Sequence, residues 1–269
     1  MMKNKLAVGL AMAAITGFAS SYALAAPQVL AGDKIKLSST PWGGANGGGE
    51  FKASALTGDS PSFNTFCIEY SEHFYYDKPL LVSKVNTGAK NGGAGGSVID
   101  PLGDPDGGGP YNNKWDPIDN RTAFLFTKFT QQSLANYEFG SANAAQNLEH
   151  KRDSESLQLA IWYLEEEISS TLNTTVYNRY MSADVDGVGQ EARDFVTLAT
   201  AANWTNNGQV KVLNLLRQSD PSSATNPFNT LAQDQLYLQP IPEPETYAMM
   251  LAGLGLIGFV ANRRRRKHM

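Results

Sequence analysis

Two short apolar segments, one near each end of the chain, limit the fold to the residues between them. Near the N-terminus, Lys3 and Lys5 precede the apolar run 6–18, and Ala23-Leu24-Ala25 follows as a small-x-small cleavage site. This order is typical of a secretory signal peptide that signal peptidase cleaves after Ala25. A retained membrane anchor is the alternative, but the run is shorter than the roughly 20 apolar residues of a spanning helix. We therefore predict that residues 1–25 are a signal peptide and that the protein is exported.

The C-terminal segment has the layout of a stop-transfer signal. Pro242, Glu243 and Pro244 precede the apolar stretch 247–261, and the basic residues 263–267 follow it. Adjacent positive charges resist translocation and stay cytoplasmic, so the stretch is expected to enter the inner membrane as a single helix with the body on the outer side. The stretch is short for a full span, which favours a transient anchor over a permanent one.

This order of Pro-Glu-Pro, apolar helix and basic tail over residues 241–269 resembles the PEP-CTERM sorting signal. The resemblance implies recognition by an exosortase, removal of the tail, and surface attachment or release in a Gram-negative bacterium that produces exopolysaccharide. The body would be periplasmic while the helix anchors it, and then lie at the cell surface or outside the cell. A simple tail anchor and an Arg-rich nucleic-acid patch are the alternatives. The second is disfavoured because the basic residues adjoin a membrane segment.

Without the two terminal signals, the body spans residues 26–240, a length that suits one large domain or two closely packed subdomains. It keeps 24 of the 26 acidic residues and loses seven of the 22 basic ones, which gives a net charge of about −9. Such an acidic body is not expected to bind nucleic acid or anionic membrane surfaces.

The hydrophobic pattern of the body changes from strand-like to helical and back, which predicts an α+β fold. We expect a β-barrel or sandwich-like part with an inserted helical subdomain. A Gly-rich segment at 88–110 is expected to be an exposed loop, because it carries too little apolar surface to order itself. Helical periodicity spans 118–201, and alternating strand patterns cover 34–37, 50–56, 63–70, 79–85, 210–216 and 235–239.

Cys67 is the only cysteine of the chain, so it has no partner for an intramolecular disulfide. An unpaired cysteine in an exported protein indicates either intermolecular pairing or a reactive thiol. Alternation in the predicted strand 63–70 places Cys67 with Thr65 and Glu69, opposite the more apolar face. A cysteine that only fills space is expected on the apolar face.

A second unusual residue is Gln158, which lies in the most hydrophobic predicted helix of the body. That helix is expected to begin near Asp153 or Ser154, either of which can cap it. Its apolar residues surround Gln158, and a buried amide needs a hydrogen-bond partner. The partner of Gln158 is therefore a question for the structure.

The residues around Cys67 and Gln158 resemble the two motifs of the Cys-Gln thioester domains of bacterial surface adhesins. The first motif matches residues 66–69, Phe-Cys-Ile-Glu, and the second matches residues 158–162, Gln-Leu-Ala-Ile-Trp. Leu157 stands where that family has Thr. The resemblance implies that the Cys67 sulfur attacks the Gln158 carboxamide, expels ammonia and leaves an internal thioester, without metal or cofactor. Glu69 and Trp162 would be its neighbours, and a surface amine or hydroxyl, for example on an exopolysaccharide, would be its target.

Three other interpretations stay open. The thioester could act only as a cross-link, which by loop entropy would stabilise the fold by roughly 4–5 kcal/mol. The protein could instead be a non-covalent structural component of an exopolysaccharide or biofilm matrix. Finally, Cys67 could be a simple buried thiol and Gln158 an ordinary helix residue.

Signals for other chemistry are weak. Asp100, Asp104 and Asp106 are calcium candidates in the Gly-rich segment, but their spacing does not fit an EF-hand, and a solvated acidic loop is the simpler interpretation. The run 165–167 of three glutamates is expected to be a solvated helix face. The three histidines lack metal-ligand spacing, and no nucleophile triad or phosphate loop is evident. We therefore expect neither a turnover enzyme nor a cofactor.

Overall fold

A computed structural model describes most of the predicted body and very little of either end. The described residues are 28–43, 48–56, 62–90, 98–99, 114–183, 185–223, 225–240, 253–254 and 257. Several predicted features lie outside them: the cleavage residue Ala25, the motif residues Pro242, Glu243 and Pro244, and the calcium candidates Asp100, Asp104 and Asp106.

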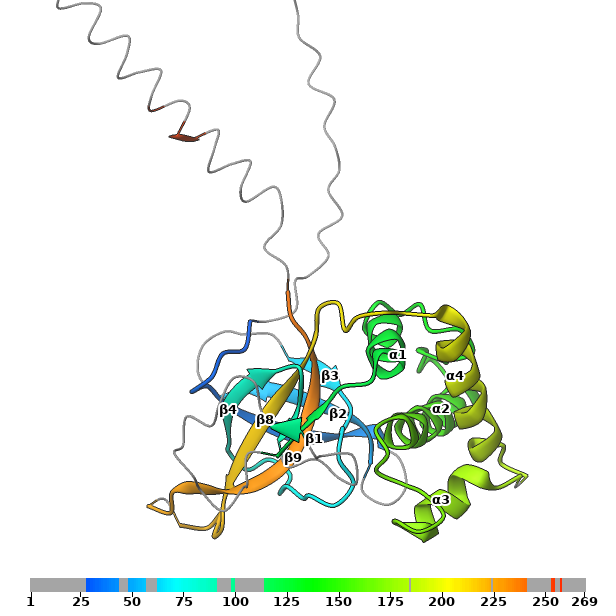
Figure 1. Cartoon of the computed structure of the whole chain (residues 1–269), viewed down its shortest axis with the longest axis horizontal. Coiled ribbons are helices and arrows are strands. Elements are labelled where there is room, and N and C mark those ends of the chain that lie inside the picture. The colour runs from blue at the N-terminus through cyan, green and yellow to red at the C-terminus, as the bar shows by residue number, and fades with distance from the viewer. Residues whose placement is uncertain are drawn as a thin grey trace, which may run out of the picture.

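The larger of two sheets has six strands in the order β3-β2-β1-β4-β8-β9, and each paired neighbour is antiparallel. A smaller sheet has the order β5-β7-β6. Figure 1 shows the strands gathered on one side of the molecule, with the helices beside them. The strands of the larger sheet are β1 (Lys34–Gly43), β2 (Gly49–Ala55), β3 (Phe63–Thr65), β4 (Leu80–Asn86), β8 (Val210–Gln218) and β9 (Phe228–Leu238). Those of the smaller sheet are β5 (Gly88–Lys90), β6 (Val98–Ile99) and β7 (Lys114–Pro117).

Four helices follow the smaller sheet, and all lie in the region where helical periodicity was predicted. They are α1 (Asn120–Thr130), α2 (Ala144–Leu164), α3 (Thr174–Met181) and α4 (Val188–Ala202). The longest, α2, runs beside α4 and also contacts β1 and β2 (Figure 1). Its central residues are buried on every side, so α2 connects the helical part to the sheet.

The α+β class is confirmed, but the sheet is not a closed barrel. Its edge strands β3 and β9 are linked beyond their regular ladders by one isolated bridge between Cys67 and Gln235. Two backbone hydrogen bonds flank this bridge, from Leu236 N–H to the Phe66 carbonyl and from Ile68 N–H to the Asp234 carbonyl. The predicted strand 63–70 ends at Thr65, because the chain then turns from β2 toward β9 instead of continuing one ladder.

Two other boundaries differ from expectation. The predicted loop 88–110 contains β5 and β6, because backbone pairing with β7 orders residues that carry few apolar side chains. The helix expected to begin at Asp153 or Ser154 begins at Ala144, where the Asn143 side chain accepts a hydrogen bond from Gln146 N–H. Asp153 instead lies inside α2 and accepts from the Glu138 N–H.

Within the described residues, no helix is both long and apolar enough to cross a membrane. The predicted span 247–261 lies almost wholly outside them, and only Gly253, Leu254 and Ile257 of that span are described, all as helix.

Candidate functional site

Cys67 lies where the two edges of the larger sheet meet, and its side chain has no exposed surface. Burial raises the pKa of its thiol well above the ordinary value, and a hydrogen bond from Gln235 acts in the opposite direction. The Gln235 Nε2 donor lies 3.3 Å from Sγ. The thiol is therefore neutral at neutral pH and has a fixed polar neighbour.

Gln158, in the middle of α2, contacts Cys67 through both atoms of its carboxamide. Its Nε2 donates to the Cys67 carbonyl at 2.8 Å, and its Oε1 accepts from the Cys67 N–H at 3.2 Å. The Gly49 N–H donates to the same Oε1 at 3.1 Å. The side chain is 1% exposed, so these bonds satisfy an amide that would otherwise be costly to bury. The structure thus brings together the two residues that the motifs singled out.

The contact between Gln158 and Cys67 belongs to a longer row of hydrogen-bonding side chains along α2. His150, Ser154, Gln158 and Trp162 are four residues apart, so they lie on one face of the helix. His150 Nε2 contacts Glu50 Oε2 at 2.8 Å, and Ser154 Oγ accepts from the Glu50 N–H at 2.8 Å. At the other end, Trp162 Nε1 donates to the Glu69 carbonyl at 3.1 Å. The row therefore fixes α2 against both β2 and the segment after Cys67.

Glu69 and Trp162, the predicted neighbours, both adjoin this site. Trp162 is buried and packs edge-on against Tyr70, with ring centroids 5.0 Å apart. Glu69 is also buried, and its carboxylate accepts from the Asp234 N–H at 3.2 Å. Burial raises the pKa of Glu69 well above its ordinary value, and the nearby carboxylates of Asp234 and Glu72 add to that effect.

These carboxylates belong to a larger buried acidic group. Burial raises the pKa of Glu72 to about 8 and that of Asp234 to about 7.

The expectation of a solvated glutamate face at 165–167 is wrong for two of its three residues. Glu165 is 5% and Glu167 1% exposed, because the chain turns back after α2 and Glu167 accepts from the Tyr70 N–H. Burial raises the pKa of Glu165 to about 8.

Glu50 lies against the N-terminal end of this row, beside His150 and Ser154. Its buried carboxylate accepts hydrogen bonds from Asn64 and Tyr137 as well as contacting His150. The Trp42 ring stacks on His150, with centroids 4.2 Å apart. This cluster fixes the start of β2, and with it Gly49, over Gln158.

Sequence reasoning missed Gly49, Glu50 and Gln235. The four-residue repeat of polar side chains in α2 is a signal that points to a buried polar partner. The glycine run 47–49 could have indicated a close backbone approach. Nothing in the sequence distinguishes Gln235 from other glutamines of alternating strands.

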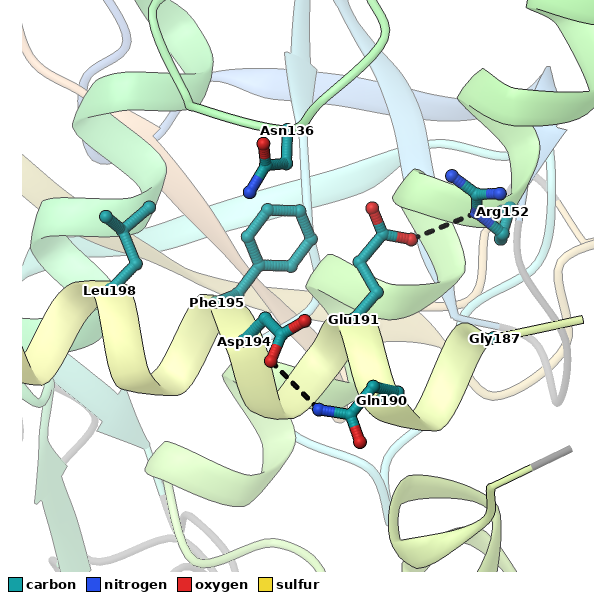
Figure 2. Close-up of a pocket in the computed structure, with 8 residues that line it drawn as sticks. All are labelled: Asn136, Arg152, Gly187, Gln190, Glu191, Asp194, Phe195 and Leu198. Carbon is teal, nitrogen blue, oxygen red and sulfur yellow. Dashed lines mark hydrogen bonds and ion pairs between the residues drawn. The ribbon is translucent and has the colours of Figure 1, made fainter.

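A surface pocket of about 320 Å³ lies elsewhere, between α2, α4 and the segment after α1 (Figure 2). Figure 2 shows the Arg152–Glu191 ion pair and the Gln190–Asp194 hydrogen bond at its wall. Neither Cys67 nor Gln158 lines it.

The described part of the chain holds no group of three or more His, Cys, Asp or Glu side chains that could bind a metal ion. Asp100, Asp104 and Asp106 lie outside that part, so the calcium prediction stays a prediction.

Comparison with known proteins gives a match at one end of the chain. Residues 240–266 match the family described as the PEP-CTERM protein-sorting motif. The C-terminal segment carries a PEP-CTERM sorting motif. Such a motif marks an exported protein that an exosortase sorts through a C-terminal membrane-anchoring signal. No curated protein and no solved structure matches the chain, so the resemblance of the body to thioester domains depends on its two short motifs.

Proposed function

We propose that this exported, exosortase-sorted protein forms an internal thioester between Cys67 Sγ and Gln158 Cδ, and that the thioester attaches it covalently to a surface amine or hydroxyl. The observation that supports this function best is the double contact of the Gln158 carboxamide with the backbone of Cys67. One residue thus supplies both the thiol and the contacts that orient the acyl group.

The proposed reaction needs orientation more than a strong base. The Cys67 sulfur bonds to Gln158 Cδ, the Cδ–Nε2 bond breaks, and the nitrogen leaves as ammonia with the thiol proton. When folding already holds the two groups in the reactive geometry, the reaction no longer has to overcome the entropic cost of bringing them together. This matters here because burial keeps the Cys67 thiol neutral and therefore a weaker nucleophile than a thiolate.

The apolar residues near Cys67 and Gln158 are expected to protect the thioester from hydrolysis. Phe66, Leu157 and Trp162 are each at most 1% exposed and belong to the same buried apolar cluster as Cys67. Water exclusion slows hydrolysis of a reactive acyl group. Leu157, which departs from the family motif, has no exposed surface and belongs to this cluster.

Intact mass spectrometry tests the proposal directly. The full chain carrying a thioester loses ammonia, about 17 Da, and gains a methylamine adduct at Gln158 after treatment with that amine. Cys67→Ala should abolish both changes and leave Gln158 as an amide. A folded wild-type chain that keeps the mass calculated from its sequence and gains no methylamine adduct would contradict the proposal.

A second candidate is a structural protein of an extracellular matrix in which the bond only cross-links the fold. The complete burial of Cys67 favours it, because an external nucleophile then needs an opening motion to reach the bond. In that case the mass loss occurs, but methylamine adds only after denaturation, and Cys67→Ala leaves matrix retention unchanged. The same substitution lowers the free energy of unfolding by roughly 4–5 kcal/mol through loop entropy.

A further inference from the structure

The Gln158 carboxamide oxygen is the acceptor of two backbone N–H groups that come from distant parts of the chain. Gly49 N lies 3.1 Å and Cys67 N lies 3.2 Å from Oε1. Both distances lie in the longer half of the usual range of about 2.7–3.2 Å for an N–H···O bond. Bonds of this length have room to shorten if negative charge develops on the oxygen.

The position of the Gly49 donor depends on two glycines. Gly49 has a φ of 111°, in the region that favours glycine over residues with a side chain. A Cβ added at Gly48 would lie 2.3 Å from Trp162 Cη2 and 2.7 Å from Gln158 Cγ. The glycine pair therefore lets the backbone pass directly over the Gln158 side chain with an N–H aimed at its oxygen.

The opposite side of the carboxamide is also defined. Its nitrogen donates to the Cys67 carbonyl at 2.8 Å, which keeps Oε1 turned toward the two N–H groups. The Glu50 cluster and the Ser154 contact fix the residue after Gly49. The donors are thus preorganised before any reaction begins.

We propose that the N–H groups of Gly49 and Cys67 form an oxyanion hole for thioester formation and transfer at Gln158; this inference rests on the proposed function. Attack by the Cys67 sulfur moves the carbonyl electron pair onto Oε1, which becomes an oxyanion between the two donors. The electron pair returns when the Cδ–Nε2 bond breaks, and ammonia leaves with the thiol proton. Donors that bind the oxyanion more strongly than the neutral amide lower the barrier of this step.

The same pair serves the second reaction. An amine that attacks the thioester again places negative charge on Oε1; the new C–N bond forms, the C–S bond breaks, and the Cys67 sulfur regains a proton from the amine. Loss of the Gly49 donor therefore slows both bond formation and aminolysis. A role confined to packing would not change the two rates together.

The test follows ammonia loss by intact mass as the full chain, produced and purified under denaturing conditions so that Gln158 is still an amide, first folds from denaturant in mild detergent. Gly49→Ala forces a side chain into the positive-φ conformation, whereas an ester in place of the residue 49 amide removes the N–H and leaves the side chains unchanged. The matched control is Gly43→Ala, at the position paired with Gly49 across the β1–β2 ladder, where an added Cβ meets only the Thr40 carbonyl at 3.6 Å. Unfolding of each variant in a Cys67→Ala background reports on the fold without the cross-link.

We expect the ester to slow thioester formation by about 10²- to 10³-fold, the usual effect of losing one oxyanion donor. Gly49→Ala should also slow it, because the strained backbone displaces the same N–H, and Gly43→Ala should have little effect. A folded ester variant that forms the thioester at the wild-type rate would overturn the oxyanion hole and leave the thioester intact. A wild-type chain that never loses ammonia would overturn the proposed function itself.

Discussion

Among single residues, Gln235 has the most direct influence on the Cys67 sulfur. It is fully buried on β9, and its Nε2 donates both to Sγ and to the Gln233 carbonyl. A donor at 3.3 Å from sulfur stabilises negative charge on it, which opposes the effect of burial on the thiol pKa. Gln235 is thus a positioning residue for the proposed nucleophile.

We predict that Gln235→Leu slows ammonia loss by roughly 10- to 150-fold, because a hydrogen bond to a group that carries or gains charge contributes about 1.5–3 kcal/mol. The rate is measured by intact mass during refolding. Gln233→Leu is the control on the same strand, since it also removes a buried amide but one that donates to the Glu69 carbonyl. Equal slowing in both variants would show that Gln235 acts through packing alone.

The element that decides the site is α2, because its polar row contacts two segments that are distant in the sequence. Ser154 lies between His150 and Gln158 in that row and accepts from the Glu50 N–H. If this acceptor is removed, a buried backbone donor loses its partner. The start of β2, and the Gly49 N–H with it, would then be less firmly placed.

We predict that Ser154→Ala lowers the free energy of unfolding by about 1–3 kcal/mol, the cost of an unpaired buried donor. Urea unfolding in a Cys67→Ala background measures this without the cross-link. The control is Ser156→Ala, because Ser156 is also buried on α2. Its hydroxyl donates to the Arg152 carbonyl and contacts Glu191, and Glu191 still has its ion pair with Arg152 after the substitution. A cost at Ser154 no larger than at Ser156 would contradict the role of the row.

Local patterns predicted the elements of this fold better than their junctions. Alternation located β1, β2 and β4, and helical periodicity located α2 with Gln158 inside it. The early end of β3 depends on a bridge between residues 168 positions apart, and the greater length of β9 depends on its pairing with β8. No local pattern encodes either pairing. The donor Gln235 was missed for the same reason, since its role appears only after the sheet and α2 are packed, whereas the glycine run 47–49 was a local signal for the close approach of Gly49.

At the scale of the whole molecule, acidic groups from separate segments meet where the sheet edges join. Glu69 and Glu72 follow β3, Asp234 lies on β9 and Glu167 follows α2. The charges of Asp234 and Glu167 raise the pKa of both Glu69 and Glu72, and Glu72 also raises that of Glu69. The fold therefore buries carboxyl groups that the unfolded chain exposes to water.

Two cations near these carboxyls offset only part of the increase in pKa that burial causes. Arg217 lowers the pKa of Glu72, and Lys90 lowers that of Asp234, but burial is the larger effect in both cases. Asp234 also accepts from the Leu215 and Lys90 N–H groups and from Asn214. The net result is that the folded chain binds more protons than the unfolded chain at moderately acid pH.

The stability of the protein is therefore predicted to fall as the pH rises. The pKa of Glu72 increases from 4.5 in the unfolded chain to about 8 in the folded chain, and that of Asp234 from 3.8 to about 7. Their stabilising contribution is complete below the unfolded values and is lost as the pH rises through the folded ones, with a slope of up to about 1.4 kcal/mol per pH unit for each group. Urea unfolding between about pH 5 and about pH 8 measures this slope. Glu72→Gln should make it shallower, whereas Glu149→Gln, at a side chain with 52% exposure, should leave it unchanged. A flat profile in the wild-type chain would show that the buried carboxyls titrate at their ordinary pKa values.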